Sequence, residues 1–366
     1  MKVQTISAKT TTSPQAKALP SDFLTDYISK RVRGKCYPVY DEIPTNLARR
    51  MEDAANNEQM KTWVNTIQSL PKTTSYIPEL TATTIKAARK SWAENVCGNQ
   101  EILNVLLRHT AEYSRTGKTS AILLAGPPGI GKTLVAKTYA QILNLPFRFV
   151  SGPSASVSRG LAGTPNLYVG SGAGAIVQAM ITSRAGNPLI CIDEIDKVST
   201  GFSGMPNFQN ELLSALDDSQ EHWHDNYIEM DVDISHVPFV FTANNLQTIS
   251  QPLLDRVEVV EMVPPTKEML HSITTQHTLP KVLRTYGSDQ IQLSDNALHT
   301  LVEQLWNSGN RSCRPYQKAV EFLVSNAFLQ ATESGNPVTV TEDDAVQVSS
   351  QFAREITTKP IGFLSA

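Results

Sequence analysis

Hydrophobic and polar positions follow two different periods along this chain. Between residues 121 and 241, short apolar runs alternate with stretches of helical spacing, and after about residue 265 the spacing is mainly helical. The apolar runs are Ala121-Ile122-Leu123-Leu124, Phe147-Arg148-Phe149-Val150, Leu189-Ile190-Cys191-Ile192 and Pro238-Phe239-Val240-Phe241. Because strands that alternate with helices usually form parallel sheets, the pattern predicts an α/β core with a parallel sheet flanked by helices.

Helical periodicity predicts the elements on either side of this core. Apolar residues recur three and four positions apart from Leu47 to Leu70, which predicts one long helix or two short ones before Pro71. Similar spacing predicts helices near residues 81–115, 266–285, 294–307 and 313–333. We therefore expect an N-terminal helical segment before the core and a smaller α-helical domain after it.

The first residues differ from the rest in composition. Residues 1–20 are rich in Thr, Ser, Lys and Ala, and such a segment buries too little apolar surface to order itself. Ser21 then caps a short predicted amphipathic helix. A basic run follows, Lys30-Arg31-Val32-Arg33-Gly34-Lys35. It is either a solvated face or an electrostatic docking site for a partner or a nucleic acid.

Length, charge and cysteines narrow the class of protein. The 366 residues suffice for one large core or two ordinary ones. The net charge of −3 hides an asymmetry, since residues 1–90 hold 14 basic and 8 acidic residues and the rest hold 18 and 27. No apolar run could span a membrane, no signal peptide is recognisable, and the four cysteines form no Cys-x-x-Cys pair. We expect a cytoplasmic protein with no membrane partner.

A glycine-rich loop follows the first apolar run. It reads Gly126-Pro127-Pro128-Gly129-Ile130-Gly131-Lys132-Thr133, and a helical stretch begins at once. This is the phosphate-binding sequence G-x-x-x-x-G-K-[ST] in its strand–loop–helix context. Backbone N–H groups and the helix N-terminus would point at phosphate oxygens. Lys132 would approach the β- and γ-phosphates, and the Thr133 hydroxyl would ligate Mg²⁺.

Two carboxylates and an amide follow later apolar runs. Asp193 and Glu194 end the run that starts at Leu189, and Asn244 follows the run that ends at Phe241. Since the carboxyl ends of parallel strands meet at one sheet edge, we expect these groups beside the phosphate loop. Asp193 would hold the Mg²⁺ shell, Glu194 would polarise the attacking water, and Asn244 would hydrogen-bond the water or the γ-phosphate. The alternative roles are helix capping for the two acids and a strand-exit turn for the amide.

An acidic tract ends in a lone cation. No Lys or Arg occurs between Lys197 and Arg256. The acidic residues of the tract are Glu211, Asp217, Asp218, Glu221, Asp225, Glu229, Asp231, Asp233 and Asp255. We expect this surface to repel a nucleic-acid backbone. Considered by itself, Arg256 is expected to form a salt bridge. His222 and His224 also lie here, but no further ligand has the spacing of a metal site, so a surface turn is favoured.

Together these motifs resemble an AAA+ ATPase, and specifically the ATPase module of Lon proteases. Besides the phosphate loop, the similar segments are Asp193-Glu194-Ile195-Asp196-Lys197, Leu167-Tyr168-Val169-Gly170-Ser171, Asn210-Glu211-Leu212-Leu213, Thr242-Ala243-Asn244, residues 252–259 and Gly309-Asn310-Arg311. The resemblance runs from Trp63, like the end of Lon's amino-terminal helical region, to Thr341, like the segment before its protease domain. It implies an AAA+ P-loop core with a helical lid, ATP and Mg²⁺ as cofactors, and assembly into a homo-hexamer.

The resemblance also assigns roles at the nucleotide. Asn244 matches the sensor-1 position. Arg256 matches the arginine finger that reaches the nucleotide of the neighbouring subunit. Arg311 matches the sensor-2 arginine of the lid, with Arg314 as a nearby second choice. Arginine fingers contribute about 10³- to 10⁵-fold to phosphoryl transfer in general.

Departures from the family pattern change what we expect. Tyr168 and Val169 match the pore loop that grips a polypeptide in the central channel, with an ordinary turn as the alternative. The segment Gly172-Ala173-Gly174 follows where Lon usually has a large apolar residue and proline, which predicts a weaker or differently aimed grip. Val96-Cys97 replace the histidine-tyrosine pair that Lon places beside the adenine. The chain stops about where the Ser-Lys protease domain would begin, and it lacks most of the Lon amino-terminal domain, so we expect no protease activity.

The expected organisation has five parts. Residues 1–45 form a basic tail and short helix, 46–80 a helical adapter, 81–263 the nucleotide-binding domain, 264–348 the α-helical lid and 349–366 a C-terminal tail. The leading hypothesis is a hexameric ATPase that unfolds or remodels a protein client, as a chaperone does. One alternative is a nucleotide-switched regulatory or scaffold module. Another is a DNA-associated motor or loader, with nucleic acid bound only through the basic N-terminal region.

Overall fold

A parallel sheet lies at the centre of the part of the chain that the computed structural model describes, residues 36–53, 58–75, 77, 79–167, 170–198, 208–286 and 291–357. Its strands are β1 (Ala121–Ala125), β2 (Phe147–Ser151), β3 (Leu189–Asp193), β6 (Phe239–Ala243) and β7 (Val257–Glu261), in the spatial order β2-β3-β6-β1-β7. Each neighbouring pair runs parallel. The predicted parallel sheet is confirmed.

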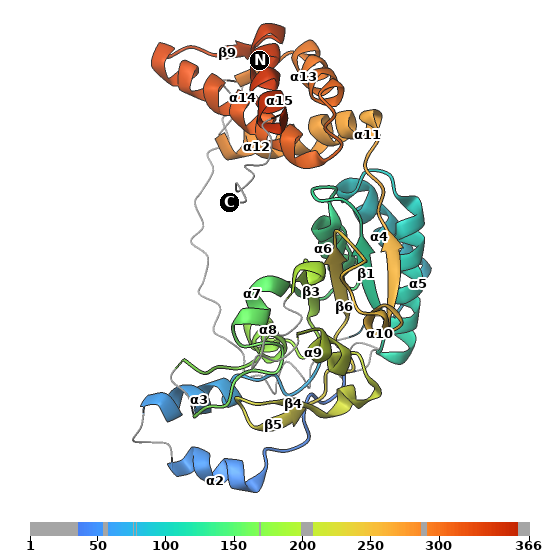
Figure 1. Cartoon of the computed structure of the whole chain (residues 1–366), viewed down its shortest axis with the longest axis vertical. Helices are drawn as coiled ribbons and strands as arrows, with labels where there is room; N and C mark the ends of the chain where they lie inside the picture. Colours follow the sequence, from blue (N-terminus) through green and yellow to red (C-terminus); the bar gives the residue numbers. More distant parts are fainter. Residues whose placement is uncertain are drawn as a thin grey trace, which may run out of the picture.

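Helices cover both faces of this sheet (Figure 1). One face carries α4 (Ala82–Asn95), α5 (Gln100–Thr116) and α6 (Lys132–Ile142), and the other carries α7 (Gly152–Val157), α8 (Ala175–Ser183) and α9 (Phe208–Ala215). Successive strand residues point to opposite faces, so Leu123 packs in the cluster with α8 while Ile122 and Leu124 pack with α6. Burial on both faces explains why the runs in the sequence are continuously apolar.

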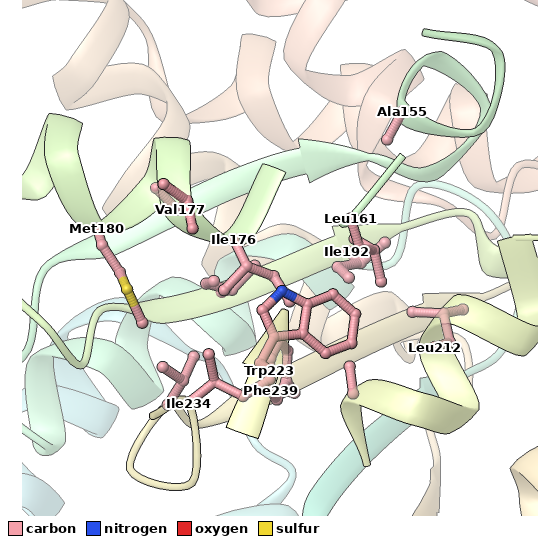
Figure 2. Close-up of a cluster of buried hydrophobic side chains, with 14 of the residues drawn as sticks. Ala155, Leu161, Ile176, Val177, Met180, Ile192, Leu212, Trp223, Ile234 and Phe239 are labelled. Carbon is pink, nitrogen blue, oxygen red and sulfur yellow. The ribbon is translucent and has the colours of Figure 1, made fainter. Parts of the chain in front are cut away.

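Trp223 occupies the centre of the core cluster on the α8 side. Figure 2 shows its ring close to Ile176 of α8, Ile192 of β3 and Phe239 of β6. Leu161, from the connection between α7 and α8, points into the same cluster. These contacts join the sheet, one covering helix and an irregular segment into one apolar core.

Trp223 comes from a short hairpin that the sequence did not predict. Its strands, β4 (Trp223–Asp225) and β5 (Met230–Val232), pair antiparallel within the acidic tract. The expectation of a surface turn around His224 is wrong in part, because Trp223 and Asp225 are buried and only His224 between them is exposed. Alternation over three residues is too short a pattern to distinguish a strand from a turn.

The N-terminal helices pack into the core of the α/β domain. α2 (Thr45–Asp53) and α3 (Glu58–Gln68) are two short helices, one of the two predicted arrangements. Leu47, Trp63 and Ile67 are almost completely buried, and they pack in the same cluster as Trp223. The expected adapter therefore supplies part of this core. The predicted helix after Ser21 and the basic run lie outside the described residues.

A separate helical body, the lid, follows the sheet (Figure 1). It consists of α11 (Lys267–Ser272), a π-helical segment η4 (Ile273–Thr278), α12 (Leu279–Tyr286), α13 (Asp295–Asn307), α14 (Cys313–Ser334) and α15 (Glu342–Thr357), with the parallel pair β8 (Ile291–Leu293) and β9 (Val338–Val340). The lid has its own apolar core, which includes Leu301 and Val324. The expected boundary at residues 348 and 349 falls inside α15, so the helix continues into the expected tail.

Shorter elements complete the described chain. They are η2 (Ile195–Lys197), η3 (Asp218–His222) and α10 (Gln251–Leu254). α10 leads into the edge strand β7, which the hydrophobic pattern did not predict because acidic residues interrupt its three valines. Within the described ranges, no helix combines the length and apolarity needed to cross a bilayer.

Candidate nucleotide site

The phosphate loop connects β1 directly to α6. Gly126 follows the strand, and its N–H donates to the carbonyl of Ala243 at the end of β6 (3.1 Å). Gly126 has a φ of 151°, and a Cβ there would lie 2.3 Å from the carbonyl oxygen of Met262, so only glycine fits. The loop then turns through Gly129 and Gly131, both with positive φ, into the first turn of α6. The open N-terminus of this 11-residue helix provides N–H groups for an anion.

Lys132 lies buried under this loop. Its ammonium donates to the carbonyls of Gly126 (2.6 Å) and Pro127 (2.9 Å) and to Oδ1 of Asn244 (2.8 Å). Burial lowers the pKa of Lys132, and the carboxylates of Asp193 and other neighbouring acids partly oppose that shift. The ammonium therefore lies among oxygen acceptors at the point where the phosphate loop meets the end of β6.

The order of the strands brings the predicted groups to one edge. β6 lies between β3 and β1, so Asn244 at its end separates the phosphate loop from Asp193 and Glu194 at the end of β3. Asn244 contacts Lys132 directly. These four predicted site residues are thus together at the carboxyl edge of the sheet, where open α/β sheets bind ligands.

Thr242 links the two acids and was not among the predicted site residues. Its hydroxyl donates to Oδ1 of Asp193 (2.5 Å) and accepts from the backbone N–H of Glu194 (3.0 Å). Thr242 is completely buried in β6. Its position opposite the end of β3 depends on strand pairing, which the sequence does not contain; its place two residues before Asn244 is the signal that could have pointed to it.

Glu194 has an unusual backbone conformation. Its φ is 58°, in the left-handed region, which costs a non-glycine residue about 1–3 kcal/mol. Two hydrogen bonds support this conformation. The Glu194 N–H donates to the Thr242 hydroxyl, and Lys197 Nζ donates to Glu194 Oε1 (2.6 Å). Nearby, Asp196 accepts from the N–H of Asn245 (3.2 Å), which ties the segment after β3 to the segment after β6. Backbone strain of this kind is common where a side chain must be aimed at a reacting group.

The phosphate loop opens into a cleft of about 1110 Å³ between the core and the lid. Core residues that line it include Lys132, Thr133, Asp193, Glu194 and Asn244. A second part of the wall consists of Val96 and Cys97 from the core with Met269, Ile273 and Gln317 from the lid. The cleft thus has a polar end at the phosphate loop and a more apolar part at the junction of the two bodies. Such a cavity suits a ligand with phosphates at one end and an aromatic base at the other.

The two candidate lid arginines occupy different places. Arg314, in the first turn of α14, lines the cleft and packs beside Gly129, where a Cβ would lie 3.2 Å from its Cγ. The backbone N–H of Cys313 also donates to the Gly129 carbonyl (2.8 Å). Arg311 instead stacks on the Trp306 ring at 3.6 Å and donates to the Trp306 carbonyl (2.8 Å). In this arrangement Arg314, the second choice from the sequence, is the arginine at the phosphate loop.

Arg256 lies at the amino ends of the strands, whereas the phosphate loop lies at their carboxyl ends. It precedes β7, whose first residue pairs with Ala121 at the start of β1, whereas the phosphate loop follows Ala125 at its end. A five-residue strand is about 17 Å long. The Arg256 side chain is 40% exposed, and its guanidinium donates to the Pro252 carbonyl (3.2 Å) and lies 4.0 Å from an Asp217 carboxylate oxygen. It is therefore a solvent-accessible cation far from its own phosphate loop.

The candidate pore loop joins α7 to α8. Tyr168 and Val169 lie outside the described residues, but the residues on both sides are described. The Thr164 N–H donates to the Gly172 carbonyl (3.1 Å), and the Gly172 N–H donates to the Thr164 hydroxyl (3.2 Å). Leu167 is 85% exposed. The two ends of the loop are thus joined at Thr164 and Gly172, and an apolar side chain is presented to solvent between them.

Many carboxylates of the acidic tract have partners elsewhere in the chain. Glu229 binds Arg50 at 2.5 Å, and Glu221 binds Lys118 at 2.7 Å. Oε2 of Glu211 accepts from the Leu161 N–H (2.5 Å), and burial raises its pKa. The tract is therefore not the free acidic surface that we expected, since cations from distant parts of the sequence neutralise some of it. Among the described residues no cluster of three His, Cys, Asp or Glu side chains could hold a metal ion.

Comparisons with known proteins agree with this site. Residues 122–265 match the family model of the ATPase family associated with various cellular activities (AAA). The Lon protease of Clostridium acetobutylicum is 32% identical over 298 residues, which cover 78% of this chain and 38% of that protein. The mitochondrial Lon protease homolog of Candida glabrata is 31% identical over 361 residues, which cover 92% of this chain and 34% of that protein.

The chain thus spans little more than a third of the length of these relatives. Among solved structures, the RuvB Holliday junction branch migration motor of Thermotoga maritima gives a TM-score of 0.45 at 19% identity, over 69% of each chain. The phosphate loop, the acids after β3 and the polar residues after β6 all lie within the span of the AAA match. The chain therefore carries an AAA+ ATPase domain and is related in sequence to Lon proteases.

Proposed function

We propose that this chain is the motor of a cytoplasmic, hexameric ATPase that hydrolyses ATP to unfold or remodel a protein client. The observation that carries the proposal is the convergence of Lys132, Asp193 and Asn244 on one cleft that the lid also lines. A cleft between two bodies links nucleotide binding to their relative motion, because a ligand that contacts both favours the closed arrangement. The four free cysteines are consistent with a reducing compartment.

The residues of the cleft fit ATP with Mg²⁺. Thr133 and Asp193 offer a hydroxyl and a carboxylate, the hard oxygen ligands that Mg²⁺ prefers, and Oδ2 of Asp193 is not used in the Thr242 bond. When bound, Mg²⁺ neutralises charge that develops on the phosphates. The phosphate loop and Lys132 would hold the phosphates, and Val96, Cys97 and Met269 would enclose the base.

Glu194 is the residue that we assign to the attacking water. Its carboxylate lies at the edge of the sheet beside Asp193, and its backbone is held by Thr242. A carboxylate within reach of a water orients it and accepts a proton as attack proceeds. Asn244 would bind the water or the γ-phosphate through its amide without adding charge. Arg314, rather than Arg311, would report the nucleotide to the lid, because it lines the cleft beside Gly129.

Arg256 supports assembly as part of the proposal. It is exposed and lies about a strand length from its own phosphate loop, so its proposed role at a nucleotide requires a neighbouring copy. An arginine finger supplied in this way stabilises transition-state charge. Each subunit would then complete the site of the next, as a ring of identical subunits allows.

A protein is the client that we propose, gripped by Tyr168 and Val169. The support is the exposed Leu167 beside them and the closure of the loop at Thr164 and Gly172. We assign no peptide hydrolysis to these residues. Degradation of casein by the purified chain in ATP would contradict that part of the proposal.

The test is ATP-dependent loss of fluorescence from a green fluorescent protein that carries an unstructured tail. We expect unfolding by the wild-type chain and none by Glu194→Gln. Tyr168→Ala should retain its basal ATPase and lose at least about tenfold in unfolding rate. The matched control is Leu329→Ala, which removes an exposed apolar side chain from α14 of the lid that does not line the cleft. If Tyr168→Ala unfolds the substrate as fast as the wild type, the threading role of the loop is wrong.

A further inference from the structure

One tight turn contacts two parts of the molecule that the sequence keeps far apart. The turn joins β4 to β5 and comprises residues 225–229, here called the 225–229 turn. On one side it holds the residues at the base of the candidate pore loop. On the other side it holds α2 and α3. Figure 1 shows the connection between α7 and α8 approaching α3 and the β4–β5 hairpin.

The first side of the turn fixes the base of the loop. Oδ2 of Asp225 accepts from the N–H of Gly174 (2.8 Å). The backbone N–H of Asn226 donates to the Ala162 carbonyl (2.7 Å), and its side-chain amide donates to the carbonyls of Ala162 and Gly163 (3.2 Å each). The two segments of the loop base are therefore bound to adjacent residues of the turn, Gly174 to Asp225 and residues 162–163 to Asn226.

Close packing at the loop base explains one of its glycines. A Cβ on Gly174 would lie 2.0 Å from the Leu161 carbonyl oxygen, so the segments at Leu161 and Gly174 pack backbone against backbone. A Cβ on Gly172 would lie 2.4 Å from the Arg159 guanidinium, but this is the end of an exposed side chain that can move away. In the segment Gly172-Ala173-Gly174, which departs from the Lon pattern, the structure thus explains the glycine at position 174.

The second side of the turn binds the N-terminal helices. Nε1 of Trp63 in α3 donates to the Tyr227 carbonyl (2.8 Å), in a fully buried setting. Arg50 in α2 forms a two-pronged pair with Glu229 (2.5 and 3.1 Å), and its guanidinium lies 5.0 Å from the centre of the Trp63 ring. Two-pronged pairs restrict orientation as well as distance.

The turn itself is rigid. Oδ1 of the buried Asp225 accepts from the N–H groups of Tyr227 (2.9 Å) and Ile228 (3.1 Å), and the Asp225 carbonyl accepts from the Glu229 N–H (2.9 Å). One carboxylate thus holds Gly174 with one oxygen and the turn with the other. The groups that bind Trp63 and the groups that hold the loop base thus belong to one hydrogen-bonded turn.

We propose that the 225–229 turn positions the base of the candidate pore loop, residues 162–163 and Gly174, and couples this base to α2 and α3, with Trp63 and Arg50 as positioning residues. The expected effect on client binding rests on the proposed function, whereas the coupling between the N-terminal helices and the loop base does not. A partner that engages the N-terminal region could then change the grip on a client through these contacts, without touching the nucleotide cleft.

The first measurement is amide hydrogen exchange of the full chain over residues 160–175. Trp63→Phe removes the indole N–H, and Arg50→Gln removes the ion pair and the cation over the Trp63 ring but leaves every buried side chain in place. Loss of one such hydrogen bond should speed exchange of the Gly174 amide about fivefold in either variant. The control is Lys118→Gln, which breaks an exposed ion pair with Glu221, a residue that makes none of the hydrogen bonds of the turn described above. If exchange rises at residues 58–70 alone, the coupling does not exist.

The second measurement uses the client. For Arg50→Gln and Trp63→Phe we expect unchanged basal ATPase, unchanged maximal unfolding rate and an increase of about threefold to tenfold in the client concentration for half-maximal rate. Arg50→Lys, which keeps the charge, should recover part of the loss. Faster exchange at residues 160–175 with unchanged client handling would support the coupling and contradict the client role of the loop. A fall in basal ATPase in both variants would overturn the positioning role, because the effect would then be general.

Discussion

At the scale of single residues, most groups of the site can be identified from the local sequence, but Thr242 cannot. Lys132 and Thr133 are recognisable because the phosphate loop is a continuous segment between a strand and a helix. Asp193 and Glu194 are recognisable because carboxylates rarely end a buried strand without a function. Thr242 contributes through its pairing partner, since β6 places it next to the end of β3. Such a contact depends on sheet order, which only the fold supplies.

Thr242 gives a prediction at this scale. Thr242→Val keeps the shape but removes the donor to Asp193 and the acceptor for the Glu194 N–H. We expect kcat for ATP hydrolysis to fall about 10- to 100-fold, as for other residues that orient a catalytic ligand. Thr242→Ser keeps the hydroxyl and should stay within about threefold of the wild type. Steady-state ATPase kinetics distinguish these outcomes, and equal activity of the two variants would show that the hydroxyl has no role.

At the scale of elements, the sequence predicted the regular and continuous segments and missed those that depend on context. The buried strands and the long lid helices were evident from their periods. The edge strand β7 was missed because Glu258 and Glu261 interrupt its valines, and Glu258 in turn binds His109 of α5 (2.8 Å). The hairpin of β4 and β5 was missed because its strands have three residues each. In each case tertiary contacts, and not local pattern, stabilise the element.

The start of α14 decides which lid arginine meets the phosphate loop. Arg311 precedes the helix and is held by Trp306, whereas Arg314 lies in its first turn beside Gly129. The two arginines are three positions apart in the sequence, and the resemblance alone could not choose between them. The choice depends on where the helix begins and on how the lid meets the core, neither of which is set by the local sequence.

The two arginines should therefore behave differently. Arg314→Ala should weaken ATP binding or turnover about 10-fold or more, because it removes a cation from the cleft. Arg311→Ala should leave ATP affinity within about twofold and destabilise the lid by about 0.5–1 kcal/mol, through loss of its contact with the Trp306 ring. Isothermal titration with a non-hydrolysable ATP analogue and thermal unfolding provide the two readouts. The reverse pattern would return the sensor role to Arg311.

At the scale of the whole molecule, parts distant in sequence form one unit. The N-terminal helices that periodicity suggested as an adapter bury Leu47 and Trp63 in the core of the α/β domain. The charge asymmetry between the first 90 residues and the rest is partly internal, since Arg50 binds Glu229. Composition and local pattern could not show this, because charge counts do not say which groups meet. The consequence is that changes in α2 or α3 act on the ATPase domain itself.

Assembly gives the prediction at this scale. By themselves, Arg256→Ala should lose about 10³-fold or more in ATP turnover, and Glu194→Gln about 10²- to 10⁴-fold. Mixed after subunit exchange, they should regain about a quarter of wild-type turnover, because an Arg256→Ala subunit keeps its own Glu194 and receives a finger from its neighbour. A mixture of Arg256→Ala with a Lys132→Ala, Arg256→Ala double variant is the inactive control. No recovery in mixtures of proven mixed composition would place Arg256 outside the neighbouring site.

The central claim is that ATP is hydrolysed in the cleft between the core and the lid, with Glu194 acting on the water. The most direct measurement compares ATP binding and single-turnover hydrolysis in the wild type, Glu194→Gln and Lys132→Ala. We predict tight binding with hydrolysis slowed by about 10²- to 10⁴-fold in Glu194→Gln, and loss of binding in Lys132→Ala. Wild-type hydrolysis rates in Glu194→Gln, with ATP bound as tightly, would contradict the account.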